Sequence, residues 1–493
     1  MTDHIALPLS ILIPLIIGLF VHMFGDRPNQ RDAVSLIGGI VTFIMVGWLL
    51  PEVMAGARPS ASLFEMLPNV SLAFRVEPLG LMFALIASGL WVLTTLYAIG
   101  YMRANGETDQ TRFYLFFAIA ISSAIGIAFS ANLLTLFIFY EALTLSTYPL
   151  VAHKGTDEAR KGARTYLVIL LGTSICFLLP AIIWTYGATG TLDFEPGGIV
   201  RGHLPPAFAP LLLALFAFGI GKAALMPFHR WLPAAMVAPT PVSALLHAVA
   251  VVKAGVFTML KVGVYIFGTD YLAETGASVW LVWLAGFTIL AASIIAMTKD
   301  DLKARLAYST VSQLSYVTLG MALAVQSGVM GGAMQIAMHA LGKITLFMCA
   351  GGIYVATHKT KVSELDGLGR RMPFTFAAFA IGALSIIGIP PTGGAWSKFY
   401  LMLATLDAHQ QVLLIVLMAS SLLNVIYLLS IPARAFFLPE AGTALRGFGT
   451  LKEAPLLCVL PPCLTAIGTI VLFFHADRIY WLIALIPTAG GHF

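Results

Sequence analysis

Five ionisable side chains stand in stretches of the sequence that are otherwise strongly apolar: Glu141, Lys222, Lys253, Lys343 and Lys398. If those stretches cross a membrane, each charge costs about 2.5–3.5 kcal/mol, and five cost about 12–18 kcal/mol before any pairing. Such residues are kept where they face one another, face water or perform a function. A carboxylate and several amines in apolar surroundings are suited to accepting and releasing protons, so we predict proton transfer as their chemistry.

The carboxylate, Glu141, stands in the stretch FIFYEALTLSTYP, where aromatic and aliphatic neighbours surround it. It therefore needs a cationic partner or a proton. Lys222 is the candidate partner, because burial favours its neutral form while a nearby carboxylate favours its charged form. We predict a Glu141–Lys222 pair that loads and releases a proton as the partner moves. The alternative is a structural ion pair that braces two helices.

Two histidines accompany the lysines in these apolar stretches. His247 precedes Lys253 by six residues, which puts the two side chains on different sides of one helix, in reach of separate parts of one polar path. His339 precedes Lys343 by four residues, which puts both on one helical face and suits a proton relay. The alternatives are a core histidine with satisfied hydrogen bonds and a polar contact that holds helices together. We predict no metal site, because no Cys, Asp or Glu accompanies the second pair.

Lys398 is the last buried charge along the chain, and it follows the stretch GIPPTGGAWS. We predict that it has the terminal role in the series and exchanges protons with one aqueous side. The alternatives are a lysine that extends to the membrane surface and a lysine that braces helices.

The elements that must position these residues are transmembrane helices. The chain has 493 residues, of which 59% are hydrophobic and 10% are charged, with a mean hydropathy of +0.90; a soluble domain is about 25% charged. Apolar stretches of about 20 residues, each long enough to cross a bilayer as a helix, recur along the whole length. We therefore predict an all-α polytopic membrane protein with 14 spans, at 5–24, 33–53, 79–101, 112–129, 132–151, 164–187, 207–232, 236–266, 278–298, 304–325, 328–357, 373–406, 410–438 and 455–475.

Two of these spans contain helix breaks. They are the seventh, which reads GIGKAALMPFHRWLP at 219–233, and the twelfth, which reads GIPPTGGAWSK at 388–398. Prolines remove backbone donors, and broken helices at membrane depth persist only where the freed groups are buried in protein or face water. The breaks lie five spans apart, which predicts two five-helix repeats of opposite orientation, an arrangement known in transporters.

The predicted domains follow from these repeats. They are three N-terminal helices at 1–110, a first five-helix repeat at 111–270, a second and inverted repeat at 275–440, and a last helix with a tail at 441–493.

Basic residues are distributed unequally between the two sides of the bundle. With both termini outside the cytoplasm, inward loops hold 19 of the 28 basic residues, and the outward side holds five: Arg58, Arg75, Arg201, Lys261 and Arg478. The remaining four are the lysines within the spans, and the same assignment leaves Glu141 as the one acidic residue at mid-span. Positive charge marks the cytoplasmic side, so both termini are predicted on the non-cytoplasmic side.

Several long motifs in this order resemble the antiporter-like membrane subunits shared by Mrp cation/proton antiporters, respiratory complex I and membrane-bound hydrogenases. The resemblance lies in KAALMPFHRWLPAAMVAPTPVSALLH at 222–247, in the segments around Glu141 and His339, in KDDLKARLAYS at 299–309, and in the second break. It runs from about residue 75 to the end of the thirteenth span.

The resemblance implies 14 helices, inverted repeats of helices 4–8 and 9–13, two discontinuous helices, and a chain of charged residues and water across the membrane midplane. Residue by residue, it assigns the ion pair to Glu141 and Lys222, bridging positions to His247 and Lys253, the central relay to His339 and Lys343, and the terminal lysine to Lys398. A lysine at that last position favours the D-type Mrp subunit, because the most similar complex I subunit has a glutamate there.

We therefore expect a proton-translocating subunit of a multisubunit monovalent cation (Na+ or K+)/proton antiporter in the cell membrane. Its expected partners are other membrane subunits, protons, Na+ or K+, and the lipid bilayer, with no nucleic acid. One alternative is a proton-pumping subunit of a redox-driven complex, and another is a structural membrane scaffold. The sequence carries no flavin, iron–sulfur or haem motif, so we expect no cofactor and no redox chemistry of its own.

Overall fold

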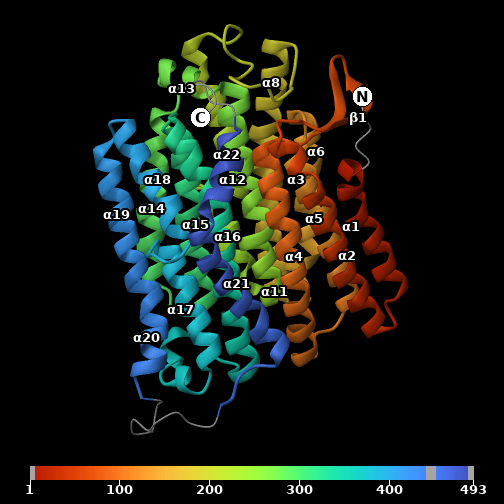
Figure 1. Ribbon diagram of the computed structural model, residues 1–493, viewed down its shortest axis with the longest axis vertical. Coiled ribbons are helices and arrows are strands. Elements are labelled where there is room, and N and C mark those ends of the chain that lie inside the picture. Colours follow the sequence, from red (N-terminus) through yellow and green to blue (C-terminus); the bar gives the residue numbers. More distant parts are fainter. Residues whose placement is uncertain (1–5, 440–450, 487–493) are drawn as a thin grey trace.

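The computed structural model describes residues 6–439 and 451–486, and it shows a bundle of long helices that run along the vertical axis of Figure 1. The N-terminal helices are α1 (Ala6–Met23), α2 (Pro28–Trp48), α3 (Leu50–Met54) and α4 (Pro78–Ala104). The next group is α5 (Gln110–Phe129), α6 (Leu133–Val151), α7 (Asp157–Thr173), α8 (Leu179–Thr189), α9 (Ala209–Gly219), α10 (Trp231–Ala234), α11 (Thr240–Ala244), α12 (Val251–Val262) and α13 (Thr269–Thr275).

The second half of the chain also consists of long helices and interrupted helices. It comprises α14 (Val279–Thr298), α15 (Leu302–Ala322), α16 (Gln326–Thr357), α17 (Pro373–Ile387), α18 (Gly394–Asp407), α19 (Gln411–Asn424), α20 (Ser430–Phe437), α21 (Leu456–Phe474) and α22 (Ala476–Ala484). π-Helical turns join several of them: η1 (Ser174–Leu178), η5 (Leu245–Val249), η6 (Gly263–Phe267) and η9 (Val425–Leu429). Single turns of 3-10 helix are η2 (Pro206–Phe208), η3 (Gly221–Ala223), η4 (Ala235–Val237), η7 (Val362–Glu364) and η8 (Leu368–Arg370).

Helix α16 is the centre of the bundle. It packs against α15, α17, α18 and α21 and also reaches α4, α11 and α12. Its most apolar stretch is 94% buried, whereas α1 and α2 are only 33% buried over theirs. The outer helices expose large apolar side chains, as expected where helices face lipid or partner subunits.

The two breaks that the prolines predict are present. Helix α9 ends at Gly219 and is followed by η3, non-helical turns and the short α10, while α17 ends at Ile387 and is separated by residues 388–393 from α18. A further interruption lies in the eighth predicted span, where η5 separates α11 from α12. No proline stands inside that turn, so the sequence reasoning missed it.

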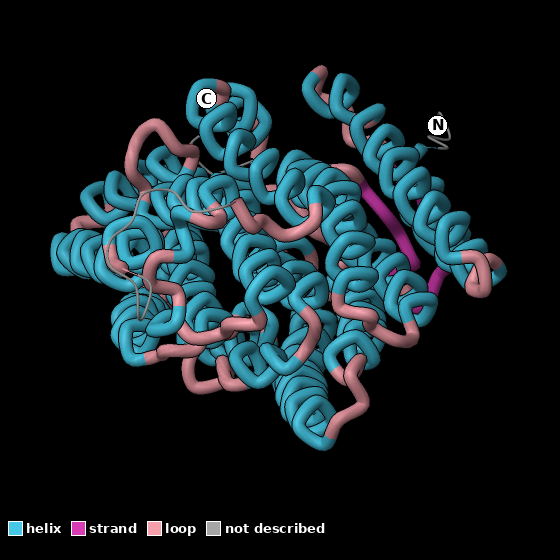
Figure 2. The backbone as a smooth tube through the Cα atoms, turned by 90° about the horizontal axis from the view of Figure 1, so that it is seen from below, coloured by secondary structure: helices cyan, strands magenta, loops and turns pink. Residues whose placement is uncertain are grey.

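One element departs from an all-helical description. The connection between α3 and α4 forms an antiparallel hairpin of β1 (Ser60–Leu67) and β2 (Val70–Arg75). Figure 2, which looks along the helices, shows these strands at the edge of the bundle near the N-terminal helices. The hairpin contacts α6, because the Asn132 side chain that caps this helix donates to the Ser71 carbonyl.

Among the described residues, 11 helical stretches are long and apolar enough to cross a membrane, and helices occupy all the predicted ranges. Helix α15 and the two broken spans do not meet that length and hydropathy criterion, so the count of 14, the inverted repeats and the domain boundaries stay predictions. The first described residues of α1 and the end of α22 lie at the same end of the bundle (Figure 1).

One prediction about charge placement was wrong, namely that four lysines lie within the spans. Lys261, which was counted with the outward side, lies inside α12 and is 1% exposed, so it is a fifth. The predicted span 236–266 already contained this lysine, but its place near the end of the span led to its assignment to the aqueous side. Another residue of the same charge assignment, Arg446, lies outside the described residues.

Candidate functional site

Lys222 is positioned by the first break. The chain leaves α9 after Gly219, and the 3-10 turn η3 directs the Lys222 side chain against α6. Its Nζ atom donates to the Tyr140 carbonyl at 2.8 Å and to Thr144 Oγ1 at 2.6 Å, and it lies 3.2 Å from the centre of the Tyr140 ring. The ammonium is therefore held by neutral oxygen atoms and an aromatic face.

Glu141 follows Tyr140 on α6 and acts electrostatically on Lys222. No direct ion pair joins the two side chains in the described part of the chain. Both carboxylate oxygens of Glu141 are buried, and neither has a hydrogen-bond partner in the part of the chain that the structure describes. The predicted pair is thus a close approach without a direct contact, so a proton passing between these groups needs a bridging water or a rotamer change.

The central pair differs from the one that helical spacing suggested. Lys253 of α12 makes a short hydrogen bond between its Nζ and His339 Nδ1 on α16. Lys343, one turn from His339, donates to the Leu306 carbonyl at 3.2 Å. The structure therefore joins Lys253 and His339 from different helices and leaves Lys343 beside them on the same face of α16.

His247 lies in the π-helical turn η5. Both of its ring nitrogens are buried without a hydrogen-bond partner among the described residues, and the ring lies 4.7 Å from that of Phe347, centre to centre. Lys343 and Lys253 both act electrostatically on it. π-Helical turns often occur at functional sites because they reorient one side chain relative to the rest of the helix.

Lys398 is held beside the second break. Its Nζ donates to Ser421 Oγ at 2.9 Å and lies 5.0 Å from the centre of the Tyr316 ring. Its aliphatic part passes over Gly388, which has a φ of +88°, and a Cβ at that glycine would lie 2.7 Å from Lys398 Cδ. A glycine is required here for both reasons.

Two buried glutamines, which the sequence reasoning missed, lie between the central and terminal groups. Gln335 Nε2 donates to Gln313 Oε1 at 2.9 Å, and Ser397 Oγ donates to Gln335 Oε1 at 2.6 Å. Gln335 is one turn before His339, and Ser397 precedes Lys398. A search limited to charges overlooks them, although the spacing Gln335-x3-His339-x3-Lys343 was a readable signal.

The helices that carry these residues contact one another in series. The turn η3 packs on α12, α12 packs on α16, and α16 packs on α18. The side chains predicted to transfer protons are thus distributed laterally across the bundle.

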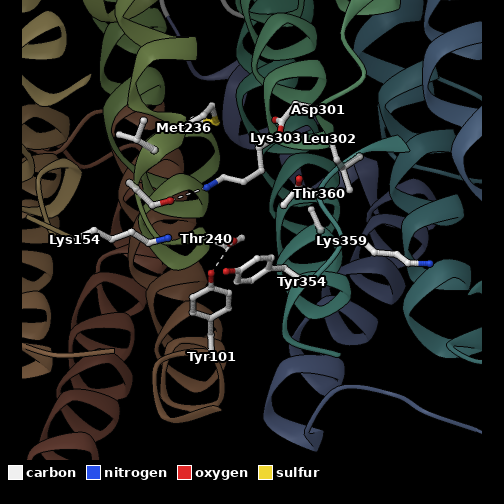
Figure 3. A pocket seen from close by; sticks show the side chains of 13 residues that line it. Tyr101, Lys154, Met236, Thr240, Asp301, Leu302, Lys303, Tyr354, Lys359 and Thr360 are labelled. Carbon is white, nitrogen blue, oxygen red and sulfur yellow. Dashed lines mark hydrogen bonds between the residues drawn. The ribbon is translucent and has the colours of Figure 1, made fainter. Parts of the chain in front are cut away.

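A cavity of about 240 Å³ opens at the end of the bundle that the loop charges predict to face inward. Lys154 and Lys303 extend toward it, and Lys303 Nζ donates to the Ala238 carbonyl at 2.6 Å (Figure 3). Thr240 and Tyr101 line its inner part, with their oxygens 3.5 Å apart.

Buried polar atoms continue from this cavity toward the central group. Thr240, Ser243 and His247 follow one another at helical spacing, and Tyr97 stands one turn before Tyr101 on the facing α4. Within residues 6–439 and 451–486, no hydrogen-bond partner is found for the Ser243 hydroxyl, the Tyr97 hydroxyl or the His247 nitrogens. Water is the group that ordinarily satisfies such atoms, so this line is suited to carrying protons between the cavity and His247.

The described residues contain no group of three His, Cys, Asp or Glu side chains that could hold a metal ion. The chemistry available to the site is the gain and loss of protons by amines, imidazoles and carboxylates, assisted by hydroxyl and amide groups.

Residues 130–424 match the family described as "NADH:quinone oxidoreductase/Mrp antiporter, TM". The chain belongs to this family. The matched range contains all seven predicted site residues. Residues 67–114 also match a family described as "NADH-Ubiquinone oxidoreductase (complex I), chain 5 N-terminus".

Relatives of two functional kinds cover nearly the whole chain. The N subunit of the NADH-quinone oxidoreductase of Desulforudis audaxviator is 32% identical over 97% of this chain and 97% of its own length. The D subunit of the Na(+)/H(+) antiporter of Alkalihalophilus pseudofirmus is 27% identical over 96% of this chain and 94% of its own. The A/B subunit of a probable K(+)/H(+) antiporter of Rhizobium meliloti is 31% identical, but the chain spans only 40% of its length.

Two solved structures share the fold. The Mrp complex from Dietzia sp. DQ12-45-1b contains a chain with a TM-score of 0.87 at 22% identity, covering 99% of this chain and 97% of that one. The membrane-bound sulfane sulfur reductase, described as an archaeal respiratory membrane complex, contains one with a TM-score of 0.85 at 23% identity, covering 98% and 96%. This family member is therefore a multi-pass, mostly helical membrane protein.

Proposed function

We propose that this protein is a proton-translocating subunit of a multisubunit monovalent cation/proton antiporter. The observation that carries the proposal is the lateral series of titratable groups on successive, contacting helices: the half-buried Glu141 and the buried Lys222, His247, Lys253, His339, Lys343 and Lys398. Residues this costly to bury are best explained by a function in which their charge changes.

Each group has a distinct role in the proposed path. Glu141 and Lys222 form the first proton-exchanging pair, Lys253, His247, His339 and Lys343 form the central relay, and Lys398 is the terminal group. Gln335 and Ser397 support the step from the central relay to Lys398 by linking the two helices through hydrogen bonds. The cavity lined by Lys303 and Thr240 supports proton entry from the inward side at His247.

The antiporter assignment draws support from the near full-length relation to the D subunit of a Na(+)/H(+) antiporter and from the fold shared with a chain of an Mrp complex. On this proposal the partners are other membrane subunits and the transported ions are protons together with Na+ or K+. We place the protein in the cell membrane, with both termini on the non-cytoplasmic side and with inverted repeats of five helices around the two breaks.

A second candidate function is a proton-pumping subunit of a redox-driven complex. The specific observation in its favour is the 32% identity with the N subunit of an NADH-quinone oxidoreductase along 97% of both chains. Electron transfer would then occur in partner subunits.

Gentle purification in detergent followed by mass spectrometry separates the two candidates. Small hydrophobic membrane subunits as partners, together with Na+- or K+-dependent proton movement in liposomes, are expected for the antiporter. Co-purifying iron–sulfur subunits would contradict that assignment and support the redox-driven complex. An assembled complex in which Lys222→Met and Lys343→Met both retain full proton translocation would overturn both.

A further inference from the structure

A second group of buried charges lies away from the lateral series, toward the predicted outward side. Lys261 stands near the end of α12, where its Nζ lies 3.5 Å from Glu77 Oε2 and donates to the Ser130 carbonyl at 2.7 Å. The ammonium also lies 4.2 Å from the centre of the Phe194 ring. Within the described residues, Lys261 is the only lysine that forms an ion pair with a carboxylate.

Glu77 connects this buried ammonium to the protein surface. It precedes α4 and is 5% exposed. Its Oε1 accepts a hydrogen bond from Arg75 Nε at 3.1 Å, while Oε2 makes no hydrogen bond with the described residues. Arg75 is partly exposed, and one of its terminal nitrogens lies 3.6 Å from the carboxylate of the exposed Glu195. A series of charged side chains, Glu77, Arg75 and Glu195, thus connects the buried Lys261 ammonium to water at this end of the bundle.

Lys261 also lies on the same helix as the central relay. It follows Lys253 by eight residues, a rise of about 12 Å along the helix. Phe257 stands between them, and its ring packs on Phe83 with centres 5.1 Å apart. An apolar layer therefore separates the central relay from the Lys261–Glu77 pair, and a barrier of this kind prevents a continuous leak of protons.

A purely structural brace does not explain these features well. Burying an ion pair removes two charges from water, and well-packed apolar residues usually stabilise a protein as much or more. Glu77 Oε2 also meets Lys261 Nζ at 3.5 Å without a hydrogen bond, which is a looser contact than a brace selected for stability would make. Both features fit a carboxylate that accepts a proton.

We propose that Lys261 and Glu77 form the outward terminal of the proton path, reached from the central relay at Lys253, whereas Lys398 ends only the lateral series; this refinement rests on the proposed function. When water enters the layer at Phe257, a proton passes from the Lys253 ammonium to the neutral amine of Lys261. The Lys261 ammonium then transfers a proton to the Glu77 carboxylate, leaving an amine and a carboxylic acid. The acid releases the proton to water on the outward side beside Arg75 and Glu195, which regenerates the carboxylate.

The test uses the whole complex, purified with its partner subunits and reconstituted in liposomes, and measures proton translocation with a pH-sensitive dye. Glu77→Gln keeps an acceptor for Arg75 and leaves Lys261 bound to the Ser130 carbonyl, so the complex is expected to assemble. We expect at least a tenfold loss of proton translocation in this variant. Full activity in the assembled Glu77→Gln complex would overturn the proposal.

A double variant, Glu77→Gln with Lys261→Met, distinguishes a relay from a brace. Removing both charges avoids a lone buried charge, so a pair that is only a brace would regain transport in the double variant. A pair that relays protons still lacks at least 90% of the transport in the assembled double variant. Recovered transport in the double variant would therefore contradict the proposal.

Two further variants complete the comparison. Arg201→Gln removes the exposed Arg201–Glu274 ion pair, which also lies at the end of the bundle predicted to face outward. Because this pair is exposed and is not a part of the proposed path, the variant is expected to leave transport unchanged. Lys343→Met tests the proposed function in the same assay. If Lys343→Met abolishes transport while the Glu77 and Lys261 variants retain it, only the outward terminal is wrong; if Lys343→Met also retains transport, the proposed function itself fails.

Discussion

Lys222, Lys343 and Lys398 share one way of being held. In the structure, each ammonium donates to a backbone carbonyl or a hydroxyl instead of pairing with a carboxylate. Neutral oxygens stabilise an ammonium less than a carboxylate does, so these contacts favour a lysine that gives up its proton. Glu141, which lies near Lys222 without touching it, can then alter the balance by a small movement.

Gln335 forms an amide bridge between Gln313 and Ser397, and this bridge supports a prediction at the scale of single residues. Replacing Gln335 with Leu removes the hydrogen bonds to Gln313 and Ser397 at 2.9 and 2.6 Å and puts an apolar group between His339 and Lys398. Because the lateral step then lacks polar support, we expect proton translocation to fall roughly tenfold, a modest value for a lost proton-transfer group. Dye-based measurements on reconstituted complex check this.

The matched control lies on the same helix. Thr345→Val removes a hydrogen bond of similar length, from Thr345 Oγ1 to Thr465 Oγ1 at 2.7 Å, away from the series. It is expected to leave translocation unchanged. Equal losses in the two variants would show that α16 tolerates no polar deletion, and the bridge would then have no specific role.

The sequence showed which residues were unusual but not which ones meet. Glu141, the lysines and the histidines can be identified from the sequence, because the free-energy cost of an ionisable group in the membrane depends on the apolar stretch that contains it. Lys253 and His339 are 86 residues apart, and their contact depends on how α12 packs on α16. Glu77 and Lys261 were overlooked for another reason: each stands near the end of an apolar stretch, where a charge usually reaches water.

At the scale of elements, length and proline content predicted most of the bundle. Every apolar range contains an observed helix and both proline-rich breaks are present, but the short helices α13 and α22 lie outside the predicted ranges. The turn η5 and the hairpin of β1 and β2 could not be predicted in this way. A π-helical turn adds one residue to a helix without a distinctive composition, and the hairpin is formed by a polar connection that packs on the start of α6.

Close approach of helices yields a second prediction. Gly255 of α12 lies against the turn that carries Lys222, and a Cβ added there would lie 2.3 Å from the Ala223 nitrogen and the Lys222 carbonyl carbon. Backbone atoms cannot move aside cheaply, so Gly255→Ala is expected to destabilise the protein by about 1–3 kcal/mol. A lower midpoint of thermal unfolding in detergent measures this effect.

Gly187 provides the comparison, because it lies in α8 and a Cβ there meets nothing within 4 Å. Alanine is a better helix former than glycine, so Gly187→Ala is expected to leave stability unchanged or to raise it by about 0.5–1 kcal/mol. If both variants unfolded at the wild-type temperature, the close packing of α12 on the Lys222 turn would be contradicted.

At the scale of the whole molecule, the proposed path needs two different aqueous sides. The cavity beside Lys303 lies at one end of the bundle, and the Glu77–Lys261 pair lies at the other, near the hairpin. The excess of basic residues in the loops at the cavity end predicts that this end faces the cytoplasm. The direction of proton movement through the molecule therefore depends on an orientation that can be measured directly.

Single cysteines at the two ends give that measurement. Ser60 at the start of β1 and Asp157 at the start of α7 are both exposed. The two residues lie at opposite ends of the bundle. Helix α6 starts against the hairpin that contains Ser60, and its 19 residues span about 28 Å before the connection to α7, which begins at Asp157. In a chain with its four native cysteines replaced by alanine, a membrane-impermeant thiol reagent applied to intact cells is expected to label Ser60→Cys and not Asp157→Cys. Asp157→Cys should react only after the membrane is opened. The reverse pattern would place the basic loops outside, and the cavity beside Lys303 would then be the outward mouth of the path and Glu77 its inward terminal.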